Sequence, residues 1–117
     1  MSETHTGSCH CGKVKFSFEG AIEGAMGCNC SYCGRAGVRL AFVPKEKFTL
    51  LSGEDALTDY LFNKKVIHHL FCSTCGIGAF GRGVGPDGAE MVAINVRCVD
   101  GVDAEKLPTQ WYDGASK

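Results

Sequence analysis

The sequence predicts a mostly-β fold, a single domain over residues 1–117 built from short antiparallel strands and metal-binding cysteine clusters. Several segments alternate apolar and polar residues, which is the period of a half-buried strand. Sixteen glycines favour tight turns over long helices. Eight cysteines, in a chain with no apolar run that could serve as a signal peptide or membrane span, indicate metal ligands rather than disulfides.

The N-terminal half begins with a polar stretch, residues 1–6, that we expect to be a loose arm. Alternation of apolar with polar residues then predicts a half-buried strand over 13–20, with Val14, Phe16 and Phe18 on its inner face. Three further strands are predicted over residues 38–43, 48–51 and 56–62. The last of these has mixed periodicity, and we favour a strand over a short helix.

The C-terminal half contains the longest strand candidate. Residues 66–71 predict a strand that runs into Cys72, and residues 77–80 are expected to return antiparallel to it. A loop is predicted over 81–88, which holds four glycines and one proline. The clearest long strand is predicted over 90–99, with Cys98 on the same face as Val92, Ile94 and Val96, and residues 104–107 suit one helical turn.

Seven of the eight cysteines fall into three clusters, which are Cys9 and Cys11, then Cys28, Cys30 and Cys33, then Cys72 and Cys75. Four protein ligands are typical of a structural zinc, and three with an open position are typical of a working zinc. Seven thiols therefore suggest two zinc ions per chain. Joining the first pair to the last would close a loop of roughly 60 residues and hold the fold. The central three would form the open site.

Spacing alone leaves other pairings open. Cys30 and Cys33 could join the last pair, which would leave Cys9, Cys11 and Cys28, and an iron–sulfur cluster or a disulfide framework are further alternatives. Cys98, or one of the adjacent His68 and His69, could close the central site with a fourth ligand. We interpret Cys98 instead as a small buried apolar residue.

The local geometry of the clusters can also be predicted. Cys9 and Cys11 would face one side of an extended chain. Each Cys-x-x-Cys ends in a glycine, Gly34 or Gly76, which suits a tight turn with positive φ. His68 and His69 would face opposite sides of their strand.

The formal net charge is −1, so the chain does not have the excess of basic residues that is typical of nucleic-acid-binding proteins. We expect a cytoplasmic location, where thiols stay reduced. A zinc held by three thiolates suits a soft incoming ligand such as a thiol. A thiol bound there would be deprotonated near neutral pH and could attack a small carbonyl compound.

Four stretches, residues 7–12, 28–33, 71–77 and 95–100, resemble the glutathione-dependent formaldehyde-activating enzyme family, which belongs to the superfamily of centromere protein V. The resemblance spans residues 7 to 113. It implies two packed, twisted β-sheets, similar to the Rab exchange-factor accessory protein. It also implies a structural zinc at Cys9, Cys11, Cys72 and Cys75, and a second zinc of variable occupancy at Cys28, Cys30 and Cys33.

The activity that this resemblance implies is that of a carbon–sulfur lyase, which combines glutathione with formaldehyde to give S-(hydroxymethyl)glutathione. The chain departs from many relatives at Gly78-Ala79, where a histidine and a proline are often seen. Four arginines are candidates for binding substrate carboxylates, namely Arg35, Arg39, Arg82 and Arg97. Two alternatives are a thiol or aldehyde carrier without turnover and a structural zinc module that docks on a protein. The oligomeric state is not predicted.

Overall fold

The computed structural model describes residues 4–20, 22, 24–29, 31–60, 68–84 and 88–112. Within these residues the chain forms ten strands, one short α-helix and four 3₁₀ turns. The strands are β1 (Thr4–Ser8), β2 (Lys15–Glu19), β3 (Ala25–Cys28), β4 (Leu40–Pro44), β5 (Phe48–Ser52), β6 (Leu57–Tyr60), β7 (His68–Cys72), β8 (Phe80–Val84), β9 (Glu90–Asn95) and β10 (Thr109–Tyr112). The helical elements are α1 (Ser31–Ala36), η1 (Lys45–Lys47), η2 (Glu54–Ala56), η3 (Val96–Cys98) and η4 (Ala104–Lys106).

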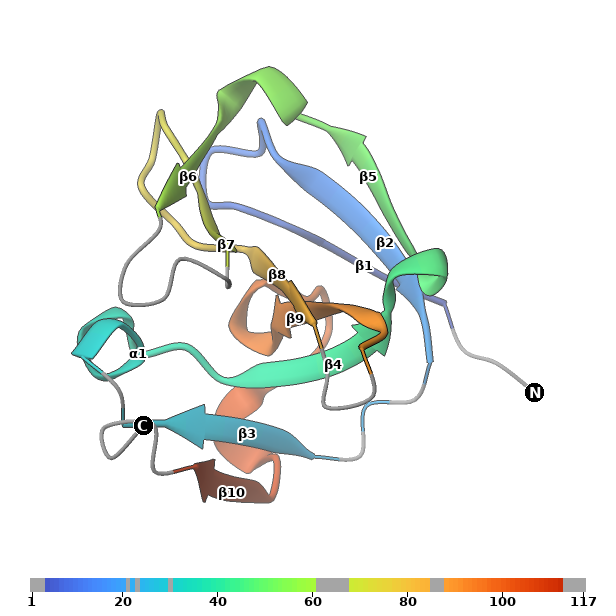
Figure 1. Cartoon of the computed structure of the whole chain (residues 1–117). Coiled ribbons are helices and arrows are strands. Elements are labelled where there is room, and N and C mark those ends of the chain that lie inside the picture. The colour runs from blue at the N-terminus through green and yellow to red at the C-terminus, as the bar shows by residue number, and fades with distance from the viewer. Residues whose placement is uncertain are drawn as a thin grey trace.

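The strands form two sheets, as Figure 1 shows. The small sheet has the order β1-β2-β5, and the large sheet has the order β10-β3-β4-β9-β8-β7-β6. Every described strand pair is antiparallel except β10 with β3, which is parallel. The expected mostly-β fold with two packed sheets is confirmed. No helix in the described residues is long and apolar enough to cross a membrane.

An aromatic core lies between the two sheets. The Phe16 ring of β2 lies 5.7 Å from the Phe48 ring of β5 and 6.1 Å from the Phe80 ring of β8, measured between centroids. Val14, Phe16 and Phe18 are buried, as their alternation predicts. Burying each side chain of this size stabilises the fold by about 1.5–3 kcal/mol. The core therefore fixes the small sheet against the centre of the large one.

The expectation of a loose arm over residues 1–6 is wrong for residues 4–6, and residues 1–3 lie outside the described part. Residues 4–8 form β1, which pairs antiparallel with β2 from Thr4↔Glu19 to Ser8↔Lys15. The side chains are polar, but a strand is held by its backbone hydrogen bonds, which do not depend on them. The His5 ring also stacks on Phe18, at 5.2 Å between centroids.

Two strands in the C-terminal half of the chain, β8 and β9, have different boundaries from those that the sequence predicts. The strand expected at 77–80 instead occupies Phe80–Val84, so it shares only Phe80 with the prediction and continues into the segment predicted as a loop. Its glycines allow close approach, since a Cβ at Gly81 would lie 2.8 Å from the His68 carbonyl oxygen. The strand predicted over 90–99 ends at Asn95, whose side chain accepts a hydrogen bond from the Arg97 N–H at 3.2 Å and begins η3.

Other predicted elements lie close to their expected positions. Four strands, β4 to β7, overlap the strands predicted over 38–43, 48–51, 56–62 and 66–71. The turn η4 is the helical turn expected over 104–107. Residues 61–62 and 66–67 of those predictions lie outside the described residues. Sequence analysis missed β3, α1 and β10. Of these, β10 is an edge strand whose Trp111 covers Gly27 of β3, because a Cβ at Gly27 would lie 2.4 Å from the Trp111 ring.

Candidate functional site

Four cysteine sulfurs from two distant parts of the chain meet at one corner of the molecule. Cys9 and Cys11 belong to the connection between β1 and β2, and Cys72 and Cys75 lie at the end of β7 and in the turn after it. The Cys11 Sγ atom lies 3.6 Å from those of both Cys9 and Cys72, and all four sulfurs lie within 4.8 Å of one another. A tetrahedral zinc with Zn–S bonds of about 2.3 Å requires sulfurs about 3.8 Å apart, so this cluster could hold such an ion.

Two tight backbone turns position these sulfurs. In the first, the Gly12 N–H donates to the Cys9 carbonyl at 3.3 Å, and the Val14 N–H donates to the Cys9 sulfur at 3.4 Å. In the second, the Gly76 N–H donates to the Cys72 carbonyl at 2.7 Å. Gly12 and Gly76 have φ of 84° and 82°, the left-handed conformation that glycine adopts most readily. The expected extended geometry for Cys9 and Cys11 is therefore replaced by a turn.

Backbone N–H groups stabilise negative charge on part of the cluster. Those of Cys11 and Ile77 lower the pKa of the Cys75 thiol to about 6, and those of Cys75 and Thr74 lower the pKa of Cys72. The Lys13 N–H lowers the pKa of Cys11, but desolvation and the adjacent thiols outweigh it and raise that pKa to about 11. A cluster that already favours thiolates at two positions is chemically suited to a soft divalent cation such as zinc.

This four-cysteine cluster joins the two sheets. Cys11 belongs to the small sheet's β1–β2 connection, and Cys72 belongs to β7 of the large sheet. A second cross-link lies beside it, where the Lys13 ammonium group donates to the Thr74 hydroxyl at 3.3 Å. Among the described residues, the four cysteines of this cluster are the His, Cys, Asp or Glu side chains that lie close enough together to share a metal ion. Its position suits a structural role.

Cys98 lies near the four-cysteine cluster. It is half-buried in η3 and packs against the core that contains Cys9. Burial, followed by the charges of Cys9 and Cys75, raises the pKa of its thiol to about 11. The strand that was expected to carry Cys98 ends three residues earlier, and the thiol that was interpreted as buried is half-buried at the edge of the core.

Two of the three central cysteines lie in described elements next to one another in the chain, β3 and α1. Cys28 ends β3 and is half-buried, Cys33 lies within α1 and is buried, and Cys30 falls outside the described residues. The Asn29 N–H donates to the Tyr112 carbonyl at 3.2 Å, which anchors the connection to the edge strand β10. The three-cysteine zinc site therefore stays a prediction. The tight turn expected at Gly34 is wrong, because Gly34 lies inside the helix.

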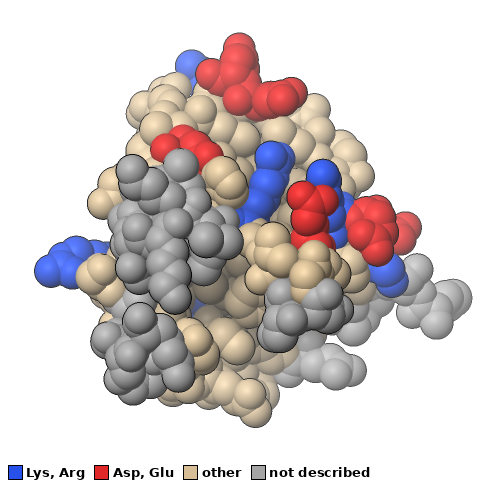
Figure 2. All heavy atoms as spheres, in the orientation of Figure 1, with Lys and Arg blue, Asp and Glu red and all other residues tan. Residues whose placement is uncertain are grey.

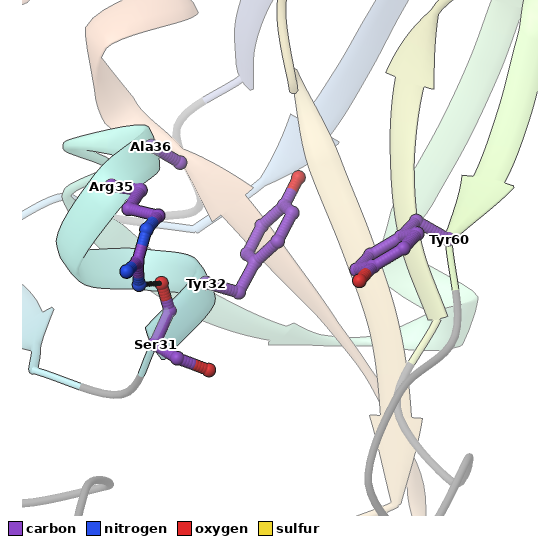
Figure 3. Close-up of a pocket in the computed structure, with 5 residues that line it drawn as sticks. All are labelled: Ser31, Tyr32, Arg35, Ala36 and Tyr60. Atoms are coloured by element: carbon purple, nitrogen blue, oxygen red, sulfur yellow. Dashed lines mark hydrogen bonds between the residues drawn. The ribbon is translucent and has the colours of Figure 1, made fainter.

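A pocket of about 480 Å³ opens on the helix that carries Cys33. Its lining residues are Ser31, Tyr32, Arg35, Ala36 and, from β6, Tyr60. Figure 3 shows Tyr32 and Tyr60 facing each other, with Arg35 folded back toward Ser31. The two tyrosine rings stack at 5.8 Å between centroids, and the Arg35 guanidinium donates to the Ser31 carbonyl at 2.9 Å.

The two histidines of β7 point to opposite faces of the sheet, as predicted. His69 lies beside Tyr32, with 4.3 Å between ring centroids, and so supports the pocket. His68 hydrogen-bonds to Asp59 on the other face at 2.5 Å. Burial, followed by the charges of Cys33 and Tyr60, raises the pKa of Tyr32. Its phenol therefore stays protonated at neutral pH.

The four candidate arginines have different surroundings. Arg39 stacks on Trp111, 4.9 Å from the ring centroid, and Arg97 pairs with Glu105 at 2.6 Å. Arg82 lies in a different pocket, described below. Arg35 alone among these four lines the pocket on α1. Sequence analysis missed the role of Tyr32, Tyr60 and His69, although Tyr32 lies between two of the clustered cysteines.

Two comparisons with known proteins agree with this architecture. The family model described as "glutathione-dependent formaldehyde-activating enzyme" matches residues 4–113. A crystal structure of a protein from Rhodobacter sphaeroides superposes with a TM-score of 0.78 and 30% sequence identity. That superposition covers 90% of this chain and 99% of the Rhodobacter chain.

Proposed function

Because the chain belongs to the glutathione-dependent formaldehyde-activating enzyme family, we propose that it is a zinc-dependent carbon–sulfur lyase. In this proposal, a thiol such as glutathione binds at Cys28, Cys30 and Cys33 and adds to formaldehyde or a related small aldehyde. The observation that carries the proposal is the pocket on α1, the helix that also contains Cys33. The product class would be an S-(hydroxyalkyl) thiol, of which S-(hydroxymethyl)glutathione is the example.

We assign two different roles to the cysteine clusters. Cys9, Cys11, Cys72 and Cys75 would hold a structural zinc, since four thiolates leave no coordination position for substrate. Cys28, Cys30 and Cys33 would hold a second zinc and leave one position open. When bound there, zinc would lower the pKa of an incoming thiol so that it is deprotonated at neutral pH.

The pocket residues suit an anionic thiol of peptide-like size. Arg35 offers a planar group that can bind a carboxylate through two parallel hydrogen bonds. It can exchange its present hydrogen bond to the Ser31 carbonyl for a stronger, charge-assisted one. Tyr32 and Tyr60 supply an aromatic wall on which the apolar part of a bound thiol could pack.

The proposed addition needs no reactant besides the thiol, the aldehyde and water. The thiol releases its proton to solvent, and its sulfur forms a bond to the carbonyl carbon as the C=O π bond opens. The carbonyl oxygen then takes a proton from water and becomes a hydroxyl group. In the reverse direction the carbon–sulfur bond breaks, and the aldehyde and thiol are regenerated. The intrinsic barrier is low, so the protein would contribute mainly binding and orientation.

We also propose that the protein works in a reducing, cytoplasmic environment. Cys9, Cys11, Cys72 and Cys75 lie close enough together to share a metal ion, and thiols bind zinc only in their reduced form. Such thiols are retained where the compartment keeps them reduced.

The experiment that tests this proposal measures both metal and rate. Zinc is counted per chain before and after Cys30→Ser, and the count is expected to fall from two to about one with the fold retained. Thiohemiacetal formation from glutathione and formaldehyde is then followed with and without protein. Arg35→Gln is expected to raise the KM for glutathione about 10-fold. The matched control Lys47→Gln, on the exposed turn η1, should leave KM unchanged.

Each contrary outcome has a distinct meaning. Equal rates with and without protein would remove the enzymatic claim, and glutathione binding without acceleration would identify a carrier. A second zinc that is tightly held and unresponsive to thiols would favour a structural module. Global unfolding of Cys30→Ser would mean that the structural and open sites have been assigned the wrong way round.

A further inference from the structure

A second pocket, of about 340 Å³, lies on the opposite face of β7 from the pocket on α1. Its residues come from four neighbouring strands and the turn η1, and they include Asp59, His68, Leu70, Arg82, Val92 and Lys45. This volume is at the lower end of the range for ligand pockets, about 300–1,000 Å³. It is therefore large enough for a small metabolite.

Strand register explains why charged side chains gather beside the core. His68 pairs with Arg82 across β7 and β8, and Arg82 pairs with Val92 across β8 and β9. Residues directly opposite in neighbouring strands share one face. Val92 is buried in the inter-sheet core, so Arg82 and His68 point to the same side of the large sheet as that core. The pocket thus has an apolar floor, which includes Leu70.

Most of the charges in this pocket are already matched. Lys45 pairs with Glu90 at 3.2 Å, and the Asp59 carboxylate hydrogen-bonds to Nδ1 of His68 at 2.5 Å. Arg82 differs, because its guanidinium lies over the Phe80 ring at 5.6 Å and no described carboxylate lies within ion-pairing distance of it. Figure 2 shows basic and acidic side chains close together around the hollowed centre of one face.

The bond between Asp59 and His68 also fixes the direction of the imidazole. With Nδ1 held by the carboxylate, Nε2 is the nitrogen that remains for a further contact. His68 stands directly opposite Arg82 in the strand register, where Cβ atoms are about 4.5–5.5 Å apart. A ligand that bridges Arg82 and His68 therefore needs two acceptor atoms close together.

We propose that this pocket binds a small monocarboxylate with a short aliphatic body, at a site separate from the thiol site. The carboxylate accepts two parallel hydrogen bonds from Arg82 and one from Nε2 of His68 in its imidazolium form, which carries hydrogen on both ring nitrogens, and the aliphatic part lies on Leu70 and Val92. The planar fork of arginine suits a carboxylate, and the apolar floor beside it favours a ligand with an aliphatic body over an inorganic anion. This inference does not depend on the proposed lyase activity.

Butyrate is the probe that tests the proposal, with the zinc-loaded full-length chain. Binding is followed by the shifts of backbone amide signals in ¹H–¹⁵N NMR spectra. Saturable shifts are expected at His68, Gly83 and Met91, with smaller changes in α1. Arg82→Gln should weaken butyrate binding at least 10-fold, and Arg82→Lys, which keeps the charge but loses the fork, should weaken it about 5-fold. His68→Gln should weaken it several-fold.

Three controls decide the outcome. Arg35→Gln, in the other pocket, should leave butyrate binding unchanged, and unshifted amide signals elsewhere will show that each variant is folded. Equal binding of butyrate by Arg82→Gln and by the unaltered chain would overturn the proposal. So would phosphate binding as tight as butyrate binding, because that would mean recognition of charge alone. Absence of butyrate binding with lyase activity intact would likewise overturn this site without touching the proposed function.

Discussion

The sulfurs of Cys11 and Cys72 lie 3.6 Å apart, although 61 positions separate the two residues in the sequence. One belongs to the small sheet's β1–β2 connection and the other ends β7 of the large sheet. A metal ion bound between them would cross-link the two sheets beside the core. Its binding free energy would then contribute directly to folding, as for other structural zinc sites.

Cys72→Ser tests this cross-link. Serine has a similar size but is a poor zinc ligand, so the variant should lose one zinc per chain and at least about 4 kcal/mol of unfolding free energy. Zinc analysis and thermal unfolding followed by circular dichroism would measure both. The control is Cys98→Ala, which removes a neighbouring thiol outside the four-cysteine cluster and should cost only about 1 kcal/mol. A cooperative, zinc-replete Cys72→Ser variant would contradict the structural role.

Gly27→Ala tests the packing of the edge strand. A Cβ at this position would lie 2.4, 2.6 and 2.8 Å from three carbons of the Trp111 ring, so the ring must move. Overpacking of this kind typically costs about 1–3 kcal/mol, and the lower end is expected because Trp111 is 66% exposed. Trp111 is the chain's only tryptophan, so its fluorescence reports the displacement directly.

Gly34→Ala serves as the comparison for that variant. The nearest atom to a Cβ there is the Asn29 carbonyl oxygen at 3.8 Å, which is ordinary contact. Alanine also has a higher helix propensity than glycine, by about 1 kcal/mol, so this variant should be neutral or slightly stabilised. Unchanged tryptophan emission in Gly27→Ala would show that Trp111 does not rest on Gly27 in solution.

The fold class was predictable because it depends on short-range patterns. Alternation at Val14, Phe16 and Phe18 reports a strand with one buried face, and the structure buries all three. The β10–β3 pairing was not predictable, because it is parallel and joins residues about 80 positions apart, such as Trp111 with Gly27. β1 was missed for a related reason. Its stability comes from backbone pairing with β2, and its polar side chains carry no apolar alternation.

The four-cysteine cluster was predictable from the sequence, whereas the pocket on α1 was not. Cysteine pairs close in sequence carry a metal-ligand spacing that can be recognised without a structure, and Cys9 and Cys11 do meet Cys72 and Cys75. The pocket on α1 arises from tertiary packing, because Tyr60 reaches Tyr32 only after β6 and β7 pair. Tyrosine is also common in ordinary strands, so no local signal distinguishes Tyr60.

Cys98 leads to a prediction about pH. Its pKa is raised from 9.0 to about 11, first by burial and then by the charges of Cys9 and Cys75. The unfolded chain would lose this proton near pH 9, whereas the folded chain keeps it to about pH 11. The stability contributed by the neutral thiol is therefore complete below pH 9 and is lost as pH rises toward 11.

Iodoacetamide labelling, read by mass spectrometry, measures this difference. At pH 8–9.5 Cys98 should react more slowly in the folded zinc-loaded protein than in guanidinium chloride, because the thiolate is the reactive form and burial, the largest cause of the raised pKa, does not depend on the metal. Comparison with the denatured chain separates the folded environment from the intrinsic reactivity of the thiol. Equal labelling rates in the folded and denatured protein would show that Cys98 is not held in the environment described above.

Tyr60 provides a test of the aromatic wall that supports the proposed thiol site. Tyr60→Ala removes the ring that stacks on Tyr32 at 5.8 Å, and such pairs contribute about 0.5–1.5 kcal/mol beyond the area they bury. We expect the KM for glutathione to rise about 5- to 10-fold, with a smaller change in kcat. Tyr60→Phe keeps the ring and should change KM less than about 3-fold. Steady-state kinetics of both variants would measure these effects. If the two substitutions were equally damaging, the hydroxyl group rather than the aromatic wall would be the feature that the site requires.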